Sequence, residues 1–600
     1  MGQFLKQAIA SFIGAIMAVV LLISLGTVGI VVFLISFSQK ESAPAIEAQS
    51  ILVLDLSTEI RDKLPPLTFS GLLTEEALPM MSLSQVIQGI EQAAEDKRIV
   101  GIFLQGTSIM NRRSGYAVLS EVRRALEKFR ATGKKVIAYD ISWSEPEYYL
   151  ASVADTIAIN PLGTLEFNGF SREFVFFSEA LKKLGIGVQV TRAGNYKGAV
   201  EPLTRNNLSQ ENRQQIQSLI TDLWTNYLQA VADSRIPNVE VLGDIANKQG
   251  FLEPEMAKRF QLIDQVAYFD EVAETLKQLT NEQDSPDSHF RSIKLNRYVT
   301  HTLAEEATSH QNEVAVIYAQ GSIVNGLGTL NQVGSDRFVK ILRQLQDNEA
   351  VKAIVLRINS PGGSATASEM ILRQLQKLAE RKPVIVSMGN VAASGGYWIA
   401  TGSEKIIAEA STVTGSIGVY GTFLNFEDIG QRNGINWETL KSAEFADINS
   451  SSRPKTSEEL ALFQAQVDQT YQSFLERVAK ARKLTKAKVA DIAQGRVWSG
   501  TAAQQIGLVD QVGGLESAVL AAAESADLEE NWTLVEYPKR RNLESALIQR
   551  LFESHLKILA PPTDPFTQQL NDLQEELRIF SQFNDPKGIY TYLPFNWQMK

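Results

Sequence analysis

The sequence contains RIVGIFL at Arg98–Leu104 and AVKAIVL at Ala350–Leu356, two short apolar runs that lie 252 residues apart. A second pair, YYLASVADTIAI at Tyr148–Ile159 and YWIATGSEKIIA at Tyr397–Ala408, repeats at an offset of 249. Two further pairs are SILVLDL (Ser50–Leu56) with EVAVIYA (Glu313–Ala319), and LGIGVQVTR (Leu184–Arg192) with NGINWETLK (Asn433–Lys441). A nearly constant offset over several hundred residues predicts a tandem repeat of one domain.

Within each copy, short β-rich runs alternate with helical patterns, which is typical of an α/β fold with largely parallel strands. We expect a first repeat over residues 45–280 and a second over 313–540. The polar segment NEQDSPDSH lies between them, so residues 281–312 are predicted to be a linker. Residues 541–600 form a tail with a basic KRRN and the aromatic end GIYTYLPFNW, to which the sequence assigns no role.

Composition excludes several classes of protein. The 600 residues carry 58 Lys and Arg against 68 Asp and Glu, a net charge of −10, which argues against nucleic-acid binding. There is no Cys, so disulfides, thiolate metal sites and a Cys nucleophile are excluded. The four His form no HExxH pair, which excludes a zincin-type metal site.

The N-terminal region predicts one transmembrane helix. Residues Ala8–Phe37 are mostly apolar and uncharged, and about 20 such residues are enough to cross a bilayer. Residues 1–44 are therefore expected to be a membrane anchor, and Lys6 places the bulk of the chain on the extracytoplasmic side. Ala43-Pro44-Ala45 resembles a cleavage site, so a cleaved signal peptide is the alternative.

A glycine turn follows a predicted strand in INSPGGSATASEMILRQLQKL, Ile358–Leu378. Gly362 and Gly363 allow backbone N–H groups to approach a ligand, and the helix that begins after them suits a developing oxyanion. A tight strand–helix turn without chemistry is the alternative. The positions 252 residues earlier hold Met110 and Asn111, so the first copy lacks this turn.

Ser394 follows a predicted strand in VIVSMGNVAASGGYWIATGS and precedes an apolar, helix-like stretch. A Ser at such an elbow can project its hydroxyl, while the amide of Gly395 can join an oxyanion hole. The GxSxG form itself is absent, and a Ser packed in a glycine-rich crossing is the alternative.

Lys197 lies in TRAGNYKGAVEPLTR, where few charged side chains are near it in sequence. A Ser nucleophile needs a base, and the four His lie in the linker region and the tail. Lysine is the remaining candidate, although it acts as a base only if desolvation lowers its pKa, and most lysines are surface residues.

The repeat supplies an internal test of this pair. The position 249 residues after Lys197 holds Ala446, and the position 249 residues before Ser394 holds Glu145. Each copy therefore keeps one half of a Ser–Lys pair, as complementary loss after a duplication would leave it.

Four motifs, SPGGSATASE, AASGGYWIA, TGSIGV and NYKGAVEP, lie on this tandem repeat behind an apolar N-terminus. Over about residues 45–540 the chain resembles the signal peptide peptidase A (protease IV) family in its long, duplicated form, Ser–Lys peptidases related to Clp protease and crotonases. The resemblance implies Ser394 as nucleophile, Lys197 as general base and proton donor, and an oxyanion hole from the amides of Gly362, Gly363 and Gly395. It also implies a pair of crotonase-like α/β domains, a homotetramer, and no metal or cofactor.

By the same resemblance the substrates are remnant signal peptides, with unfolded envelope proteins as a second class, at a plasma or thylakoid membrane. The sequence leaves two alternative functions. A crotonase-type acyl-CoA enzyme would share the fold but gives no reason for the Ser and the Lys to survive in opposite repeats. A non-catalytic membrane scaffold gives no reason to retain either residue.

Overall fold

The computed structural model describes residues 14, 46–64, 80–106, 114–236, 238–283, 289–305, 312–529, 531–538, 585 and 589–593. The predicted anchor falls almost entirely outside these residues. No helix in the described ranges is long and apolar enough to span a membrane.

The first repeat is built on a six-stranded, entirely parallel sheet in the order β10-β6-β5-β4-β1-β11. Its strands are β1 (Ser50–Asp55), β4 (Ile99–Gln105), β5 (Lys135–Asp140), β6 (Thr156–Ile159), β10 (Gln265–Val266) and β11 (Ser292–Lys294). Its helices are α3 (Leu83–Glu95), α4 (Tyr116–Ala131), α5 (Glu145–Ala151), α9 (Val239–Lys248), α10 (Pro254–Arg259), α11 (Phe269–Thr280) and α12 (Leu295–Glu305). Two small ladders pair β2 (Glu59–Arg61) with β3 (Met80–Ser82), and β7 (Leu165–Phe167) with β9 (Gly250–Leu252).

The second repeat has the same sheet, strand for strand. Its parallel order is β22-β18-β17-β15-β12-β23, with β19 and β21 added beyond the end of β17. The strands are β12 (Glu313–Gln320), β15 (Val351–Ser360), β17 (Val384–Ala393), β18 (Lys405–Ala408), β19 (Val413–Gly415), β21 (Val497–Ser499), β22 (Gln511–Val512) and β23 (Thr533–Tyr537). The helices are α13 (Ser335–Asp347), α14 (Ala365–Ala379), α15 (Gly395–Ala400), α17 (Ser457–Arg482), α18 (Lys486–Ile492), α19 (Gly500–Gln505) and α20 (Leu515–Ser525). The shared order confirms the duplication and the α/β class.

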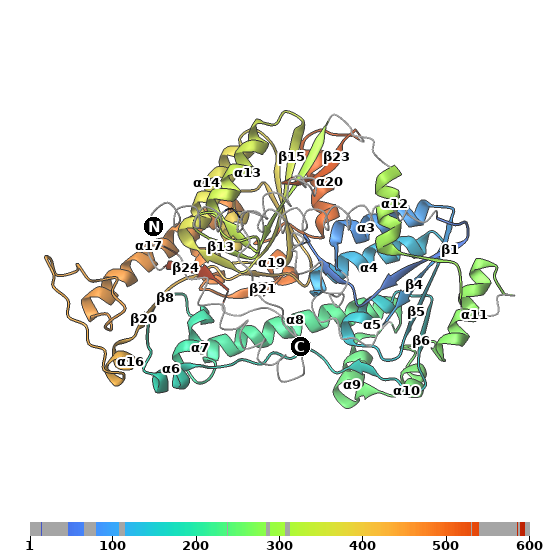
Figure 1. Ribbon diagram of the computed structural model, residues 1–600, viewed down its shortest axis with the longest axis horizontal. Helices are drawn as coiled ribbons and strands as arrows, with labels where there is room; N and C mark the ends of the chain where they lie inside the picture. The colour runs from blue at the N-terminus through green and yellow to red at the C-terminus, as the bar shows by residue number, and fades with distance from the viewer. Residues whose placement is uncertain are drawn as a thin grey trace, which may run out of the picture.

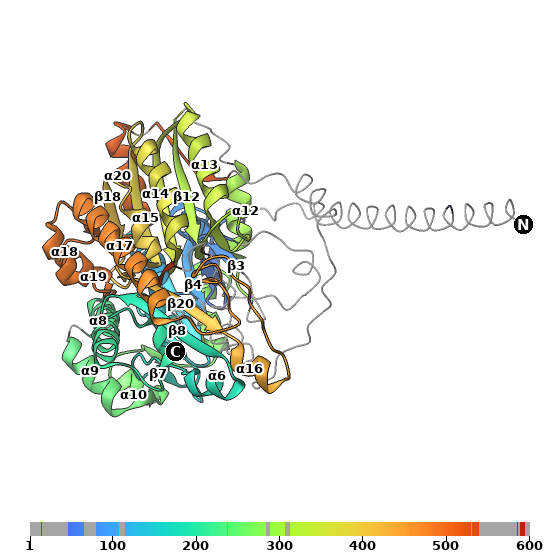
Figure 2. The same cartoon turned by 90° about the vertical axis from the view of Figure 1, so that its left-hand side faces the viewer.

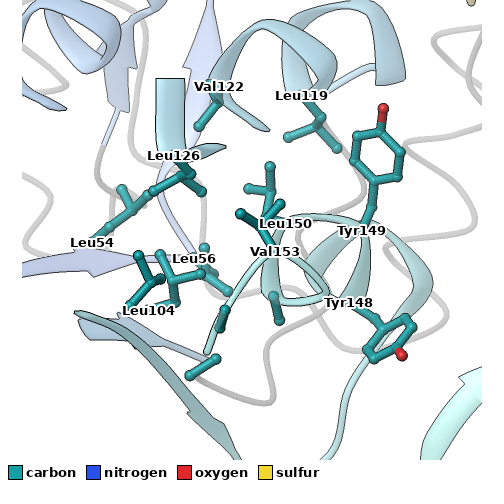
Figure 3. Packing of buried hydrophobic residues seen from close by; sticks show 14 of the residues in the cluster. Leu54, Leu56, Leu104, Leu119, Val122, Leu126, Tyr148, Tyr149, Leu150 and Val153 are labelled. Atoms are coloured by element: carbon teal, nitrogen blue, oxygen red, sulfur yellow. The ribbon is translucent and has the colours of Figure 1, made fainter. Parts of the chain in front are cut away.

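Each sheet is covered by helices on both faces, which is why its strands are nearly continuous apolar runs. In β1, Leu52 and Leu54 enter one apolar cluster while Ile51 and Val53 enter the cluster on the opposite face. Figure 3 shows the first of these clusters, where side chains of the sheet meet α4 and α5. The labelled aliphatic residues are Leu54, Leu56, Leu104, Leu119, Val122, Leu126, Leu150 and Val153.

A third sheet joins the two repeats, in the order β14-β13-β16-β24-β20-β8. Its strands are β8 (Gly187–Ala193), β13 (Ser322–Val324), β14 (Gln332–Gly334), β16 (Gly362–Ser364), β20 (Val419–Asn425) and β24 (Ile589–Tyr592). Strand β8 of the first repeat runs antiparallel to β20 of the second over seven residue pairs. The helices beside this sheet are α6 (Ser178–Leu184), η1 (Gly198–Val200), α7 (Glu201–Thr204) and α16 (Glu427–Arg432).

Helix α8 (Gln210–Ser234) is the second link between the repeats and runs below both of them in Figure 1. Its middle places Leu219 and Leu223 against apolar residues of the second repeat. Its second half places Leu228 and Val231 in the core of the first repeat. Figure 2 shows α8 beneath the layers of the second repeat.

A buried charge cluster forms the third link. The guanidinium of Arg357 on β15 lies 2.7 Å from Asp62 Oδ1 and 2.6 Å from Glu121 Oε1, both in the first repeat. All three side chains are at most 2% exposed. Burial raises the pKa of Glu121 to about 7, with Arg357 opposing the shift. Because a buried charge left without its partner is costly, the cluster fixes one repeat on the other.

Two segments differ from the sequence prediction. Part of the predicted linker, residues 292–305, forms β11 and α12, which extend the first repeat because Leu295, Tyr298 and Val299 are apolar at helical spacing and pack in its core. Part of the predicted tail forms β24 in the middle of the third sheet. The other proposed domain limits remain predictions.

Candidate active site

Ser394 occupies a sharp elbow between β17 and α15. Its backbone has φ 56° and ψ −113°, a conformation that a non-glycine residue rarely adopts, and its N–H donates to the carbonyl of Gly415 at 2.8 Å. The two residues that follow must be glycines, because a side chain at either position would not fit. A Cβ on Gly395 would lie 2.7 Å from Ser368 Oγ, and one on Gly396 would lie 2.6 Å from the carbonyl oxygen of Ser360.

Lys197 is carried to this elbow by the third sheet. Strand β8 ends at Ala193, and Gly194, with φ +108°, turns the chain so that Lys197 precedes η1. Packing here is close, because a Cβ on Gly495 would lie 2.7 Å from Lys197 Cβ. The pairing of β8 with β20 therefore positions a side chain of the first repeat inside the second.

The two side chains meet. Lys197 Nζ lies 2.7 Å from Ser394 Oγ, although the residues are 197 positions apart in sequence, and both side chains are fully buried. Burial lowers the pKa of Lys197 well below its ordinary value, because it disfavours the charged ammonium. The contact thus joins a hydroxyl to an amine whose neutral form is favoured.

Ser416 is a third member of this cluster, and no role was predicted for it from the sequence. Lys197 Nζ donates to its hydroxyl and to its carbonyl oxygen, each at 3.0 Å. Ser416 is fully buried, has φ 50°, and donates its own N–H to the carbonyl of Arg496 at 2.7 Å. The signal that could have found it is the TGSIGV motif, in which Ser416 is the serine.

The glycine turn lies beside the elbow. A Cβ on Gly363 would lie 1.9 Å from the carbonyl oxygen of Ile323, and one on Gly362 would lie 2.6 Å from the Gly395 nitrogen, so neither position has room for a side chain. The N–H of Gly362 donates to Ser360 Oγ at 3.2 Å. Of the amides expected to form an oxyanion hole, those of Gly363 and Gly395 are therefore the better candidates.

Among the described residues, the repeat counterparts of Ser394 and Lys197 form no such cluster. Glu145, the counterpart of Ser394, accepts the N–H groups of Asn168 and Gly169 on Oε1, each at 2.8 Å. Ala446, the counterpart of Lys197, is exposed. The counterparts of the glycine pair, Met110 and Asn111, lie outside the described residues.

Comparison with known proteins assigns the chain to a family. The model of peptidase family S49 matches residues 128–283 and again 376–529, once in each repeat. The chain belongs to peptidase family S49. It is a serine-type endopeptidase with tandem S49 domains, and the Clp protease family model also matches residues 305–421.

Several known proteases align with most of the chain. Protease 4 of Haemophilus influenzae is 34% identical over 95% of this chain and 95% of its own length. Protease 4 of Salmonella typhi is 33% identical over 91% and 90%, respectively. The chloroplastic serine protease SPPA of Arabidopsis thaliana is 33% identical over 84% of this chain and 74% of its own length.

Proposed function

We propose that this S49 peptidase cleaves peptides with a Ser–Lys dyad, in which Ser394 is the nucleophile and Lys197 the general base. The 2.7 Å contact between Ser394 Oγ and Lys197 Nζ carries the proposal. Neutral Lys197 takes the hydroxyl proton as Ser394 Oγ attacks the scissile carbonyl, and then gives that proton to the leaving amine. It next activates the water that hydrolyses the acyl ester.

The glycine amides stabilise the oxyanion in this mechanism. The N–H groups of Gly363 and Gly395 are the donors, and removal of one such donor in a serine protease typically lowers kcat by about 10²–10³-fold. Ser416 holds the Lys197 amine against Ser394 through its two contacts. No metal or cofactor enters these steps.

The proposed substrates are apolar peptides, above all signal peptides left in a membrane, with unfolded envelope polypeptides as a second class. The sequence supports this through the predicted anchor at 1–44, which would hold the catalytic repeats at the extracytoplasmic face of a plasma or thylakoid membrane. A peptidase fixed at that surface meets such peptides where they are left.

We also propose that the chain forms a homotetramer. Strands β8 and β20 pair within the chain, and the repeat places their counterparts at 436–442 and 170–176, which belong to none of the described sheets. Leu440 is 92% exposed and Trp437 is 45% exposed in one of these counterparts. Pairing of these two segments between copies would repeat the internal arrangement. The double variant Trp437→Asp, Leu440→Asp should disrupt this pairing and lower the mass measured by light scattering. An unchanged mass would refute the proposed pairing between copies.

The dyad is tested by hydrolysis of a fluorogenic apolar peptide by the full chain in detergent. Ser394→Ala and Lys197→Ala should each lower kcat at least about 10³-fold, as loss of a catalytic group does elsewhere. Ser473→Ala, at a half-buried position on α17, and Lys248→Ala, at an exposed position, serve as matched controls. Substantial activity in Lys197→Ala would refute the base assignment, and activity in Ser394→Ala would refute the nucleophile.

A further inference from the structure

Strand β24 comes from a part of the chain that belongs to neither repeat. It begins more than 50 residues after β23 ends, yet it lies between β16 and β20 and runs antiparallel to both. On one side Gly362 opposes Tyr592 and Gly363 opposes Thr591. The segment is thus paired directly with the glycine turn of the active site.

Thr591 lies beside the two proposed oxyanion donors, Gly363 and Gly395. Leu593 N–H donates to the carbonyl of Pro361 at 2.6 Å, so these two residues form a hydrogen-bonded pair of the antiparallel ladder. Every second pair along such a ladder is also hydrogen-bonded, and the next one here is Gly363 with Thr591. The N–H of Gly363 is therefore directed at the Thr591 carbonyl. The point that a Gly362 Cβ would occupy is 2.1 Å from the Thr591 carbonyl oxygen and 2.6 Å from the Gly395 nitrogen. The carbonyl of Thr591 therefore lies close to both proposed oxyanion donors.

The strand also fills side-chain positions as a bound peptide would. Alternate residues point to opposite sides of a strand. Leu593 is fully buried against aliphatic residues contributed by both repeats, Leu219, Leu223, Val391, Val413 and Val497. Ile589 packs against Ala193, Ala365, Val419 and Val467, and Tyr590 packs against Ala199, Val200 and Tyr420. Between them, Thr591 is fully buried, with its hydroxyl 3.2 Å from the Gly363 carbonyl oxygen.

Asp585 fastens the strand at its N-terminal side. One carboxylate oxygen accepts the hydroxyl of Ser364 and, at 3.4 Å, the N–H of Thr366, at the start of α14. The other accepts the N–H of Ile589 at 3.3 Å. This contact does not involve Ser394 or Lys197, so it can be removed without altering the dyad.

We propose that β24 is an intrinsic competitive inhibitor, a segment of the chain bound as a substrate across its own dyad. An incoming peptide must displace it from β16 and β20 to reach Ser394. The same contacts indicate what a displacing peptide needs: aliphatic side chains at the places of Ile589 and Leu593, and a small residue at the place of Thr591. This inference rests on the proposed function, since it assigns β24 to the proposed site.

The test compares hydrolysis by the full chain with that by two variants that weaken the strand. Asp585→Ala removes the fastening contact, and Leu593→Asp places a charge in an apolar environment. Both should lower KM for a fluorogenic apolar peptide at least about fivefold and leave kcat nearly unchanged. Asp244→Ala, which changes an exposed carboxylate, is the control and should not alter KM.

A synthetic peptide covering residues 585–597 keeps the test valid if either variant folds poorly. Added to Asp585→Ala enzyme, it should inhibit competitively, whereas the same peptide with Leu593→Asp should inhibit at least about tenfold less. Equal KM in the full chain and both folded variants, together with no inhibition by the peptide, would overturn the proposal.

A binding measurement separates this inference from the proposed function. Fluorescence anisotropy of the labelled 585–597 peptide is recorded with the full chain carrying Ser394→Ala and Asp585→Ala. Saturable binding without hydrolysis by any form of the protein would refute the proposed function and support the placement of the strand. Ser394-dependent hydrolysis with no binding would refute the placement alone.

Discussion

The two repeats share a sheet order, yet they end the equivalent strand in opposite ways. In the first repeat β5 is followed by Ser144, whose φ of −80° is ordinary and which forms a capping box with Glu147 at the start of α5. In the second repeat β17 is followed by Ser394, whose φ of 56° is strained and whose side chain caps nothing. A capped helix start stabilises the fold, whereas the strained one holds the Ser394 hydroxyl against Lys197.

The repeats also differ in what they receive from each other. The second repeat receives Lys197 through the β8–β20 pairing, whereas Ala446 at the equivalent place is exposed. The comparison shows that both repeats share the same sheet as a scaffold. The proposed site depends instead on loops and on strand β8, which extends from the first repeat to pair with β20 of the second. Four changes test this contrast.

The largest effect is expected from Lys197→Met, which keeps the apolar stem and removes the amine. Hydrolysis should fall at least about 10³-fold. In the wild type, kcat/KM should rise with pH through the lowered pKa of Lys197, because the neutral amine is the base. Lys248→Met, an exposed change, should retain the wild-type pH–rate profile.

Although Lys197→Met should abolish hydrolysis, it should stabilise the folded protein. Because the folded-state pKa of Lys197 is depressed, the unfolded chain binds a proton on this amine more readily than the folded chain does. Burial of Lys197 therefore lowers the free energy of unfolding. This loss decreases only as pH rises from the depressed folded-state pKa toward the unfolded-state pKa. Lys197→Met removes this cost, so its Tm at neutral pH should exceed the wild-type Tm. A lower Tm would show that the lysine is not held neutral by burial.

The junction between repeats should break with Arg357→Met. This change leaves Asp62 and Glu121 buried without their partner, which should lower the free energy of unfolding by about 3–5 kcal/mol in urea titrations. Adding Asp62→Asn and Glu121→Gln should recover much of the loss. Arg381→Met, in an exposed ion pair, should change stability by less than about 1 kcal/mol.

A smaller effect is expected from Ser416→Ala, which removes one of the two Ser416 contacts to Lys197 and leaves the carbonyl in place. Looser placement of the base should lower kcat by about 10- to 100-fold with KM unchanged. Ser416→Thr retains a hydroxyl and should recover part of the rate. Equal kcat in the wild type and Ser416→Ala would show that the hydroxyl does not position the base.

The smallest effect is expected from Glu145→Ser, which gives the first repeat a Ser at the nucleophile's position. It should not restore hydrolysis to Ser394→Ala, because Lys197 lies against Ser394 and Ala446 supplies no base. Loss of the two accepted N–H groups should cost about 1–3 kcal/mol in unfolding. Recovery of hydrolysis would show that the first repeat retains a working site.

The sequence predicted the features that depend on local pattern. Spacing was enough to predict the repeated strands, the elbow at Ser394 and the survival of Lys197 in only one copy. The structure brings the side chains of Ser394 and Lys197 together. Their catalytic roles remain a proposal. Ser416 was missed because its position depends on a backbone turn with φ 50° and not on a spacing. Strand β24 was missed because its partners are more than 160 residues away.

The central claim is that one chain supplies both halves of the dyad. Ser394→Ala and Lys197→Ala chains carrying different affinity tags are co-expressed, mixed assemblies are isolated through both tags, and their hydrolysis of the fluorogenic peptide is measured. A dyad formed within each chain predicts no activity above that of either variant alone. Recovery of a substantial fraction of wild-type activity would show that Ser394 of one chain meets Lys197 of another and would contradict this account.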